Sequence, residues 1–314
     1  MTSIGPDCSF CVSDSDPDLP KSLSPYDITL FAGSRPNVNM TKLWRALKID
    51  TGLFNGLPTS PGFFPIKCDR CEAETFEYDL DGLPGTEVLL RLGGPVEYSY
   101  RYLIFKYVEN SWRVMGYIDA WGKYRKPQHT IIVNHGVTWL NIEEQGATGS
   151  GVATYVSSVY RVTPRRVIKA FSYLSAGHQA GYFGEPSRDF NAQVVDCSIT
   201  GDRVTAVIAY SVSYYADDLE LFAKSRRAAI SKSLDSDSSG FDRAHSELSK
   251  EELEDVYNID TLTNEGFLKY NYAELMGIAR GKDLERKQWL NSFLERCKST
   301  VERRRLKQLL VAKS

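Results

Sequence analysis

Four cysteines arranged as two Cys-x-x-C pairs are the residues best suited to bind a metal ion. The pairs are Cys8-Ser-Phe-Cys11 and Cys68-Asp-Arg-Cys71. Two such pairs supply four thiolates, the ligand set of a tetrahedral structural zinc ion. In an exported protein the same cysteines would form disulfides, and otherwise they would remain free thiols. The spacing predicts zinc as the cofactor of this segment and leaves the other two states open.

A second group of candidate ligands lies in the acidic stretch Tyr78-Asp-Leu-Asp-Gly-Leu-Pro-Gly-Thr-Glu87. Asp79 and Asp81 alternate in a loop that Gly82 allows to turn sharply, and Glu87 opens an apolar run. Alternating carboxylates in a tight loop direct their oxygens towards one point, as a hard cation such as Ca²⁺ requires. The pattern predicts a calcium site at these three carboxylates, and a polar turn between strands is the alternative.

The acidic stretch resembles the loop of FG-GAP/VCBS-type repeats, in which an Asp-x-Asp-Gly loop precedes an apolar strand. A strand–turn–strand pattern with Trp112 and Gly116 is similar to the later part of such a repeat. The resemblance covers roughly residues 74–118 and appears once. It implies a β-blade scaffold that is used for binding, and no catalytic residue follows from it.

One histidine lies where a hydrolytic site would be plausible. His178 stands in the Gly-rich stretch 175–184, and Glu185 and Asp189 follow it. Loops often carry catalytic groups because a rigid scaffold presents them to solvent. A hydrolase requires these three side chains to converge in one pocket within hydrogen-bond reach. A surface loop with an incidental histidine is the alternative.

The elements that position these residues are strands in the middle of the chain. Runs rich in Val, Ile, Tyr and Phe recur over residues 74–216, with tight turns at Glu109-Asn110 and Thr200-Gly201-Asp202. The connections are too short for helical crossovers, so the strands are expected to form an antiparallel domain with a blade- or sandwich-like sheet. Residues 1–73 are expected to be irregular, with a short helix at 41–49 that carries Leu43 and Leu47 inward.

From residue 217 the hydrophobic period becomes helical, which predicts a helical region over residues 217–314 and an α+β fold class. Residues 217–234 are expected to form one helix. Trp289, Phe293, Cys297 and Val301 recur at intervals of four, as in the apolar stripe of an amphipathic helix. The remaining cysteine, Cys197, lies in a strand pattern, and both it and Cys297 are expected to be small buried residues.

Composition and charge exclude several classes of protein. The chain has 314 residues, of which 42% are apolar, so wholesale disorder is excluded. No run of 18 apolar residues occurs, so no membrane-spanning helix is expected. The net charge of -2 argues against a uniformly basic nucleic-acid-binding protein. This net charge combines an acidic segment with a basic one. Residues 1–90 contain 13 acidic and 7 basic side chains, whereas residues 281–314 contain 10 basic and 4 acidic side chains.

These observations favour a non-catalytic, β-rich binding or scaffold module with a structural cation. Its binding face is expected to be lined by aromatic residues such as Tyr98, Tyr100 and Tyr102. The rival functions are the hydrolase near His178 and contact with nucleic acid or an acidic partner through Glu302-Arg-Arg-Arg-Leu-Lys307. The first residues have no basic and apolar leader, which favours the cytoplasm, although an exported chain whose signal has been removed would look the same.

Overall fold

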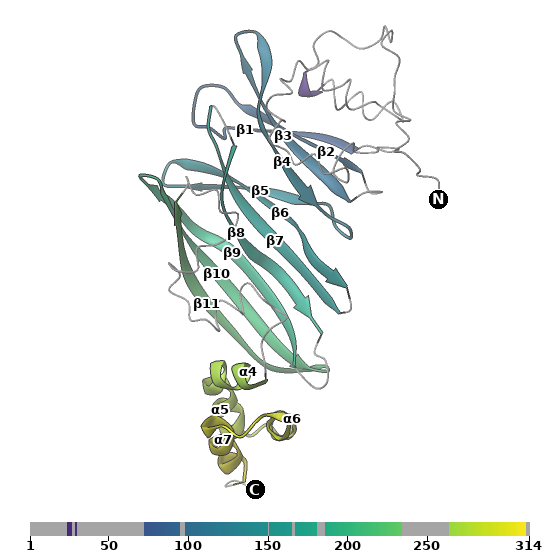
Figure 1. Cartoon of the computed structure of the whole chain (residues 1–314), viewed down its shortest axis with the longest axis vertical. Helices are drawn as coiled ribbons and strands as arrows, with labels where there is room; N and C mark the ends of the chain where they lie inside the picture. Colours follow the sequence, from purple (N-terminus) through teal and green to yellow (C-terminus); the bar gives the residue numbers. More distant parts are fainter. Residues whose placement is uncertain are drawn as a thin grey trace, which may run out of the picture. The chain divides into compact units, whose positions relative to one another are not determined.

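The computed structural model of the protein describes residues 24–26, 29, 72–94, 98–149, 151–164, 167–180, 186–233 and 264–311. These residues form antiparallel strands followed by helices, so the predicted α+β class is confirmed (Figure 1). The strands are β1 (Glu72–Tyr78), β2 (Glu87–Gly94), β3 (Ser99–Val108), β4 (Ser111–Trp121), β5 (Gln128–Asn134), β6 (Val137–Gly149), β7 (Val152–Val162), β8 (Val167–Gln179), β9 (Ser187–Thr200), β10 (Arg203–Ala216) and β11 (Leu219–Ser233). The helices are α4 (Asn264–Tyr270), α5 (Tyr272–Arg280), α6 (Leu284–Arg296) and α7 (Val301–Val311). By its contacts the chain divides into two compact units, Met1–Gln145 with Val159–Lys169 and Gly146–Ser158 with Ala170–Ser314.

The first unit contains a four-stranded sheet in the order β1-β2-β3-β4. The β3–β4 hairpin closes at Glu109 and Asn110, whose φ angles of 50° and 61° are those of a tight two-residue turn. Because side chains alternate between faces, Leu89 and Leu90 of β2 point to opposite sides, and both are fully buried. One face packs in a hydrophobic core with residues of β5–β8, namely Leu140, Ile142, Val162, Ile131, Tyr160 and Val167.

Two tyrosines that were expected to line an open binding face are buried instead, and Tyr102 belongs to this core. Tyr100 is 4% exposed and Tyr102 is fully buried, while Tyr98 at the strand end is half-buried. The alternation of the strand places Tyr100 and Tyr102 on the face that packs against the rest of the unit. The expectation of an aromatic binding face at these positions is therefore wrong.

The other sheet has seven strands in the order β11-β10-β9-β8-β7-β6-β5. The predicted turn at Thr200-Gly201-Asp202 joins β9 to β10, and Gly201 has a φ of 63°. Alternate residues of β10 from Val204 to Tyr214 are buried, so one face of this strand is apolar throughout.

The helix expected at residues 217–234 is wrong, because this segment forms strand β11. A turn at Asp217, whose φ is 52°, reverses the chain, and β11 then pairs with β10 from Leu219 to Ser233. The segment is rich in Ala, Lys, Arg and Leu, which favour helices. Backbone pairing with β10 and burial of Leu221 outweigh this weak local preference.

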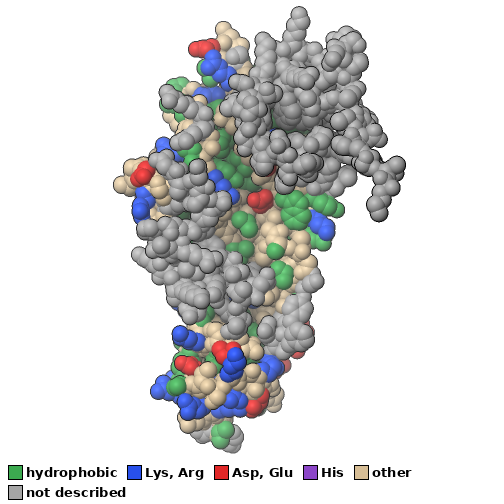
Figure 2. Space-filling model, viewed as in Figure 1, with side chains coloured by type: hydrophobic (Ala, Val, Ile, Leu, Met, Phe, Trp, Pro, Cys, Tyr) green, Lys and Arg blue, Asp and Glu red, His purple; other side chains and the backbone are tan. Residues whose placement is uncertain are grey.

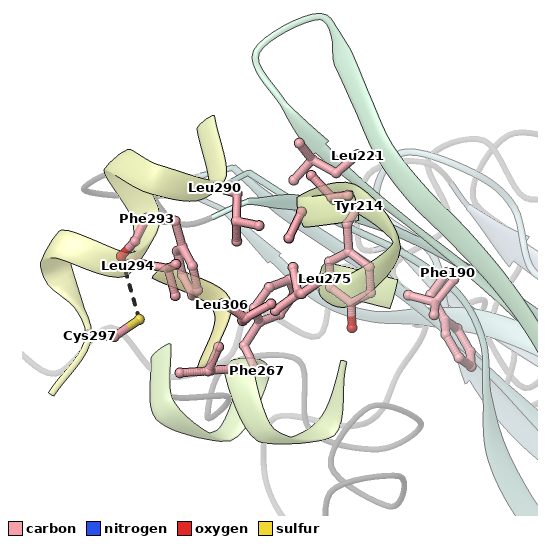
Figure 3. Packing of buried hydrophobic residues seen from close by; sticks show 14 of the residues in the cluster. Phe190, Tyr214, Leu221, Phe267, Leu275, Leu290, Phe293, Leu294, Cys297 and Leu306 are labelled. Atoms are coloured by element: carbon pink, nitrogen blue, oxygen red, sulfur yellow. Dashed lines mark hydrogen bonds between the residues drawn. The ribbon is translucent and has the colours of Figure 1, made fainter. Parts of the chain in front are cut away.

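Helices α4–α7 gather beside the ends of strands in the second unit (Figure 1). Their apolar side chains pack on Tyr214 and Leu221 of the sheet, as Figure 3 shows. The expected apolar stripe is correct at Phe293 and Cys297, which are 0% and 5% exposed. It ends at Cys297, because α6 stops there and α7 begins at Val301, which is 51% exposed. Among the described residues, no helix is long and apolar enough to cross a membrane.

Candidate functional site

The three carboxylates predicted to bind calcium do come together at one end of the four-stranded sheet. Asp79 and Asp81 lie in the β1–β2 loop and Glu87 opens β2, and one oxygen of each lies within 4.8 Å of the others. The loop is ordered by its own side chains. Asp79 Oδ1 accepts a hydrogen bond from the Gly82 amide at 3.0 Å, and Asp81 Oδ1 accepts one from the Leu83 amide at 2.9 Å.

A cationic side chain already lies among these carboxylates. Lys106 of β3 is the direct cross-strand partner of Glu87. Its ammonium is 2.7 Å from Glu87 Oε1 and 2.7 and 2.8 Å from the two carboxylate oxygens of Asp81. The side chains of Glu87 and Asp81 are fully buried, and these acidic partners raise the pKa of Lys106 although burial opposes them. The ammonium therefore supplies the positive charge that this buried acidic group needs.

The donor set fits a divalent cation only if Lys106 moves away. Glu87 Oε2 accepts hydrogen bonds from the amides of Leu80 and Asp81, at 2.6 and 3.2 Å, so both of its oxygens are engaged. Both oxygens of Asp81 are engaged by Lys106, and only Asp79 is exposed. The lysine that competes with calcium was not recognised in the sequence, because it lies 19 positions beyond Glu87 on the next strand.

The candidate zinc ligands Cys8, Cys11, Cys68 and Cys71 lie outside the described residues, as does the helix expected at 41–49, and their predictions stay predictions. Cys197 and Cys297 are both buried, as expected. Burial raises the pKa of Cys197 to about 12 and that of Cys297 to about 11. The charge of Asp196 adds to the rise at Cys197, and at Cys297 burial and Glu265 outweigh Arg303 and Arg296, so neither thiol is activated as a thiolate.

The structure brings together two of the three residues of the candidate hydrolytic site. His178 of β8 and Asp189 of β9 are directly paired across the sheet, and Nδ1 lies 2.6 Å from Oδ1. Both side chains are about half exposed, at 56% and 47%. On its other side Asp189 pairs in register with Ser213 of β10. Glu185 lies outside the described residues.

An exposed aromatic residue on a firmly held loop was missed by the sequence reasoning. Tyr124 lies in the β4–β5 connection and is 68% exposed, with the Lys123 ammonium 5.2 Å from its ring centroid. Its own amide donates to the buried Gln145 side chain at 2.9 Å. The amide of Trp121 likewise donates to Glu144 at 2.9 Å, and that of Gly122 to the carbonyl of Tyr98 at 2.8 Å.

The Glu144 carboxylate that accepts the Trp121 amide is partly buried, and this burial disfavours its charged form. Burial raises the pKa of Glu144, and the hydrogen bond from the Trp121 amide opposes that rise. In the sequence, this loop is marked only by a glycine followed by basic and aromatic residues, a pattern that is common in exposed turns. The half-buried Glu144 carboxyl and the buried Gln145 side chain thus position the loop, and the side chain of Tyr124 on this loop lies in solvent.

No protein-family model and no curated protein matches this chain.

Proposed function

We propose that the chain is a non-catalytic binding or scaffold module built on its antiparallel sheets. The observation that carries this proposal is Tyr124, which is 68% exposed on a loop held by hydrogen bonds to Gln145, Glu144 and Tyr98. A solvent-exposed ring adds little to the free energy of folding. A large aromatic side chain presented rigidly is, however, the type that dominates protein–protein interfaces, because little conformational entropy is lost when it binds.

The four-stranded sheet supports the same proposal. Strands β1–β4 follow one another in order, and the acidic loop lies between β1 and β2. This is the arrangement that the resemblance to one FG-GAP/VCBS-type repeat would imply for residues 74–118. As part of the proposal, this sheet acts as a scaffold whose acidic loop is closed by Lys106 in place of a structural cation.

The hydrolase is the weaker proposal. In a Ser–His–Asp triad the imidazole lies between the carboxylate and the hydroxyl, because it must take the proton from the nucleophile. In the described part of the sheet the carboxylate of Asp189 lies between His178 and Ser213 instead. The Nδ1–Oδ1 hydrogen bond orients the imidazole, yet Ser213 is on the wrong side of the pair to be activated by it.

Contact with a polyanion through the C-terminal helices is a second candidate function. Arg303 and Lys307 of α7 both pair with Glu295 of α6, while Arg304 and Arg305 are exposed and neither makes a salt bridge with another described residue. Figure 2 shows Lys and Arg side chains spread over these helices. Two adjacent exposed arginines suit the phosphates of a nucleic acid, which they can bind in a bidentate manner.

Selection of peptides on the immobilised full chain tests the leading proposal. Peptides enriched from a displayed random library would be titrated by calorimetry into the wild type, Tyr124→Ala and the matched control Tyr107→Ala, which removes another exposed tyrosine, 55% exposed. We expect Tyr124→Ala to weaken binding by about tenfold or more, and Tyr107→Ala to leave it unchanged. If no peptide is enriched, or if both variants bind as the wild type does, the proposal is wrong.

A further inference from the structure

His129, at the start of β5, lies in an aromatic cluster formed with the four-stranded sheet of the same unit. The rings of Phe76 and Tyr78 of β1 and of Tyr102 of β3 lie edge-on to the imidazole, with centroid separations of 4.3, 5.7 and 5.9 Å. His129 Nε2 is 2.9 Å from the hydroxyl of Tyr78. Its other nitrogen, Nδ1, is buried and has no hydrogen-bond partner among the residues that the structure describes.

A second contact holds the same end of β5. The carbonyl of Pro127 accepts hydrogen bonds from Arg91 at 2.7 Å and from the hydroxyl of Tyr102 at 2.9 Å. This contact uses groups that keep their protonation state through the neutral and mildly acidic range, because burial raises the pKa of Tyr102 to about 12 and Arg91 stays charged. Of the two contacts, only the one made by His129 contains a group that titrates near neutral pH.

We propose that His129 is a pH-sensitive latch, which fastens the start of β5 to the four-stranded sheet while the imidazole is neutral and releases it when the imidazole takes up a proton. In the neutral ring one nitrogen carries a hydrogen and the other a lone pair, so one hydrogen bond to Tyr78 is sufficient. In the imidazolium both nitrogens are donors. Nδ1 would then be a buried charged donor with no acceptor in the described part of the chain, which is a costly state among aromatic rings.

The charged groups around the latch favour the neutral ring. From β2, the Arg91 guanidinium lies 5.9 Å from the centroid of Phe76, the ring that packs closest to His129. From β1, the Glu74 carboxylate acts in the opposite direction and raises the pKa of His129. This carboxylate is, however, hydrogen-bonded to Arg91 at 2.7 Å and lies 3.9 Å from Lys126. From β3, Tyr102 is uncharged because burial raises its pKa to about 12, and β6 places Ile142 opposite His129. Burial foremost, and Arg91 next, lower the pKa of His129.

The sign of the pH effect follows from this lowered pKa. Above the ordinary histidine value of about 6.5 the imidazole is neutral in both the folded and the unfolded chain, and the latch is closed. As the pH falls below that value the unfolded chain takes up the proton first, so the latch loses its contribution to stability. The release is therefore expected on the acidic side of the ordinary histidine value.

Nuclear magnetic resonance of the full chain tests the proposal directly, by following the Cε1 proton of each histidine against pH. We expect the His129 resonance to titrate below the ordinary value of about 6.5, and at its midpoint the amides of β5 and β1 should exchange with solvent faster relative to their intrinsic rates. A His129 midpoint at or above that value, or unchanged exchange in both strands, would overturn the proposal.

A pair of variants provides the matched comparison. His129→Phe keeps an aromatic ring in the cluster but cannot titrate, whereas His135→Asn removes an exposed histidine whose φ of 51° asparagine tolerates. As the pH falls below about 6.5, the wild type and His135→Asn should take up more protons on unfolding than His129→Phe does. Equal proton uptake by all three chains would contradict the latch. If His129→Phe does not fold, the titration of the His129 resonance in the wild type is the test of the proposal.

Discussion

The ammonium of Lys106 and the carboxylate of Glu87 lie 2.7 Å apart as direct cross-strand partners on β3 and β2. The carboxylate is fully buried, and its second oxygen accepts the amides of Leu80 and Asp81. The pair thus joins the acidic β1–β2 loop to the two inner strands at one end of the sheet. It holds the position in which the spacing of the acidic residues predicted a calcium ion.

Replacing Lys106 with methionine should destabilise the protein by about 3–5 kcal/mol, because it leaves the buried carboxylates of Glu87 and Asp81 without a counter-charge. Urea unfolding of the full chain measures this difference. The matched control is Lys123→Met, which removes an exposed lysine and should change the free energy of unfolding by less than about 0.5 kcal/mol. Equal effects of the two substitutions would mean that the internal ion pair adds nothing to stability.

Calcium should affect the wild type and the Lys106→Met variant differently. Calcium chloride or EDTA should leave the unfolding midpoint of the wild type unchanged, because the ammonium occupies the space between the carboxylates. In Lys106→Met the three carboxylates are free to bind a divalent ion, so calcium should raise the midpoint. A calcium-dependent midpoint in the wild type would instead support the original prediction of a calcium site.

Substitution of two residues of the C-terminal apolar stripe should give opposite outcomes. Phe293 is fully buried against Trp289 and Phe267, so Phe293→Ala should cost about 3–5 kcal/mol of stability. Val301 is 51% exposed, and Val301→Ala should change stability by less than about 0.5 kcal/mol. Thermal or urea unfolding decides, and a large loss in Val301→Ala would show that one continuous helix buries both residues.

The two buried cysteines should react slowly with alkylating reagents in the folded protein. With pKa values of about 12 and about 11, the thiolate fractions of Cys197 and Cys297 at pH 8 are about one in ten thousand and one in a thousand. Peptide mass spectrometry after brief exposure to iodoacetamide should find both unmodified, and modified once urea is added. Since these pKa values are raised, the thiols also contribute stability that is lost as the pH rises above about 9. Rapid modification of the folded chain would contradict the assigned burial.

The second candidate function predicts binding that depends on salt. Binding of a labelled duplex DNA to the full chain, followed by fluorescence anisotropy, should weaken steeply between low and physiological salt. Replacing both Arg304 and Arg305 with glutamate should abolish it, whereas the same exchange at Arg113, an exposed arginine paired with Glu109, should leave it intact. Binding that does not change with salt, or no binding, would eliminate this candidate.

The sequence by itself determined the antiparallel strands, their tight turns and the burial of the later helices, because these depend on local patterns. Alternating apolar residues, the pair Glu109-Asn110 and Gly201 each act within a few positions of the chain. The convergence of Asp79, Asp81 and Glu87 was predictable for the same reason, since all three lie within one loop and the strand that follows it.

Only the tertiary structure determined which distant residues the side chains of the site and the strands contact. Lys106 reaches the acidic loop through the register of β3 on β2, and His129 meets three rings that lie far from it in sequence. Residues 219–233 have local preferences for a helix, yet they pair with β10. In each case the outcome depends on contacts between distant segments, whose energies exceed the fractions of a kilocalorie per mole that separate local preferences.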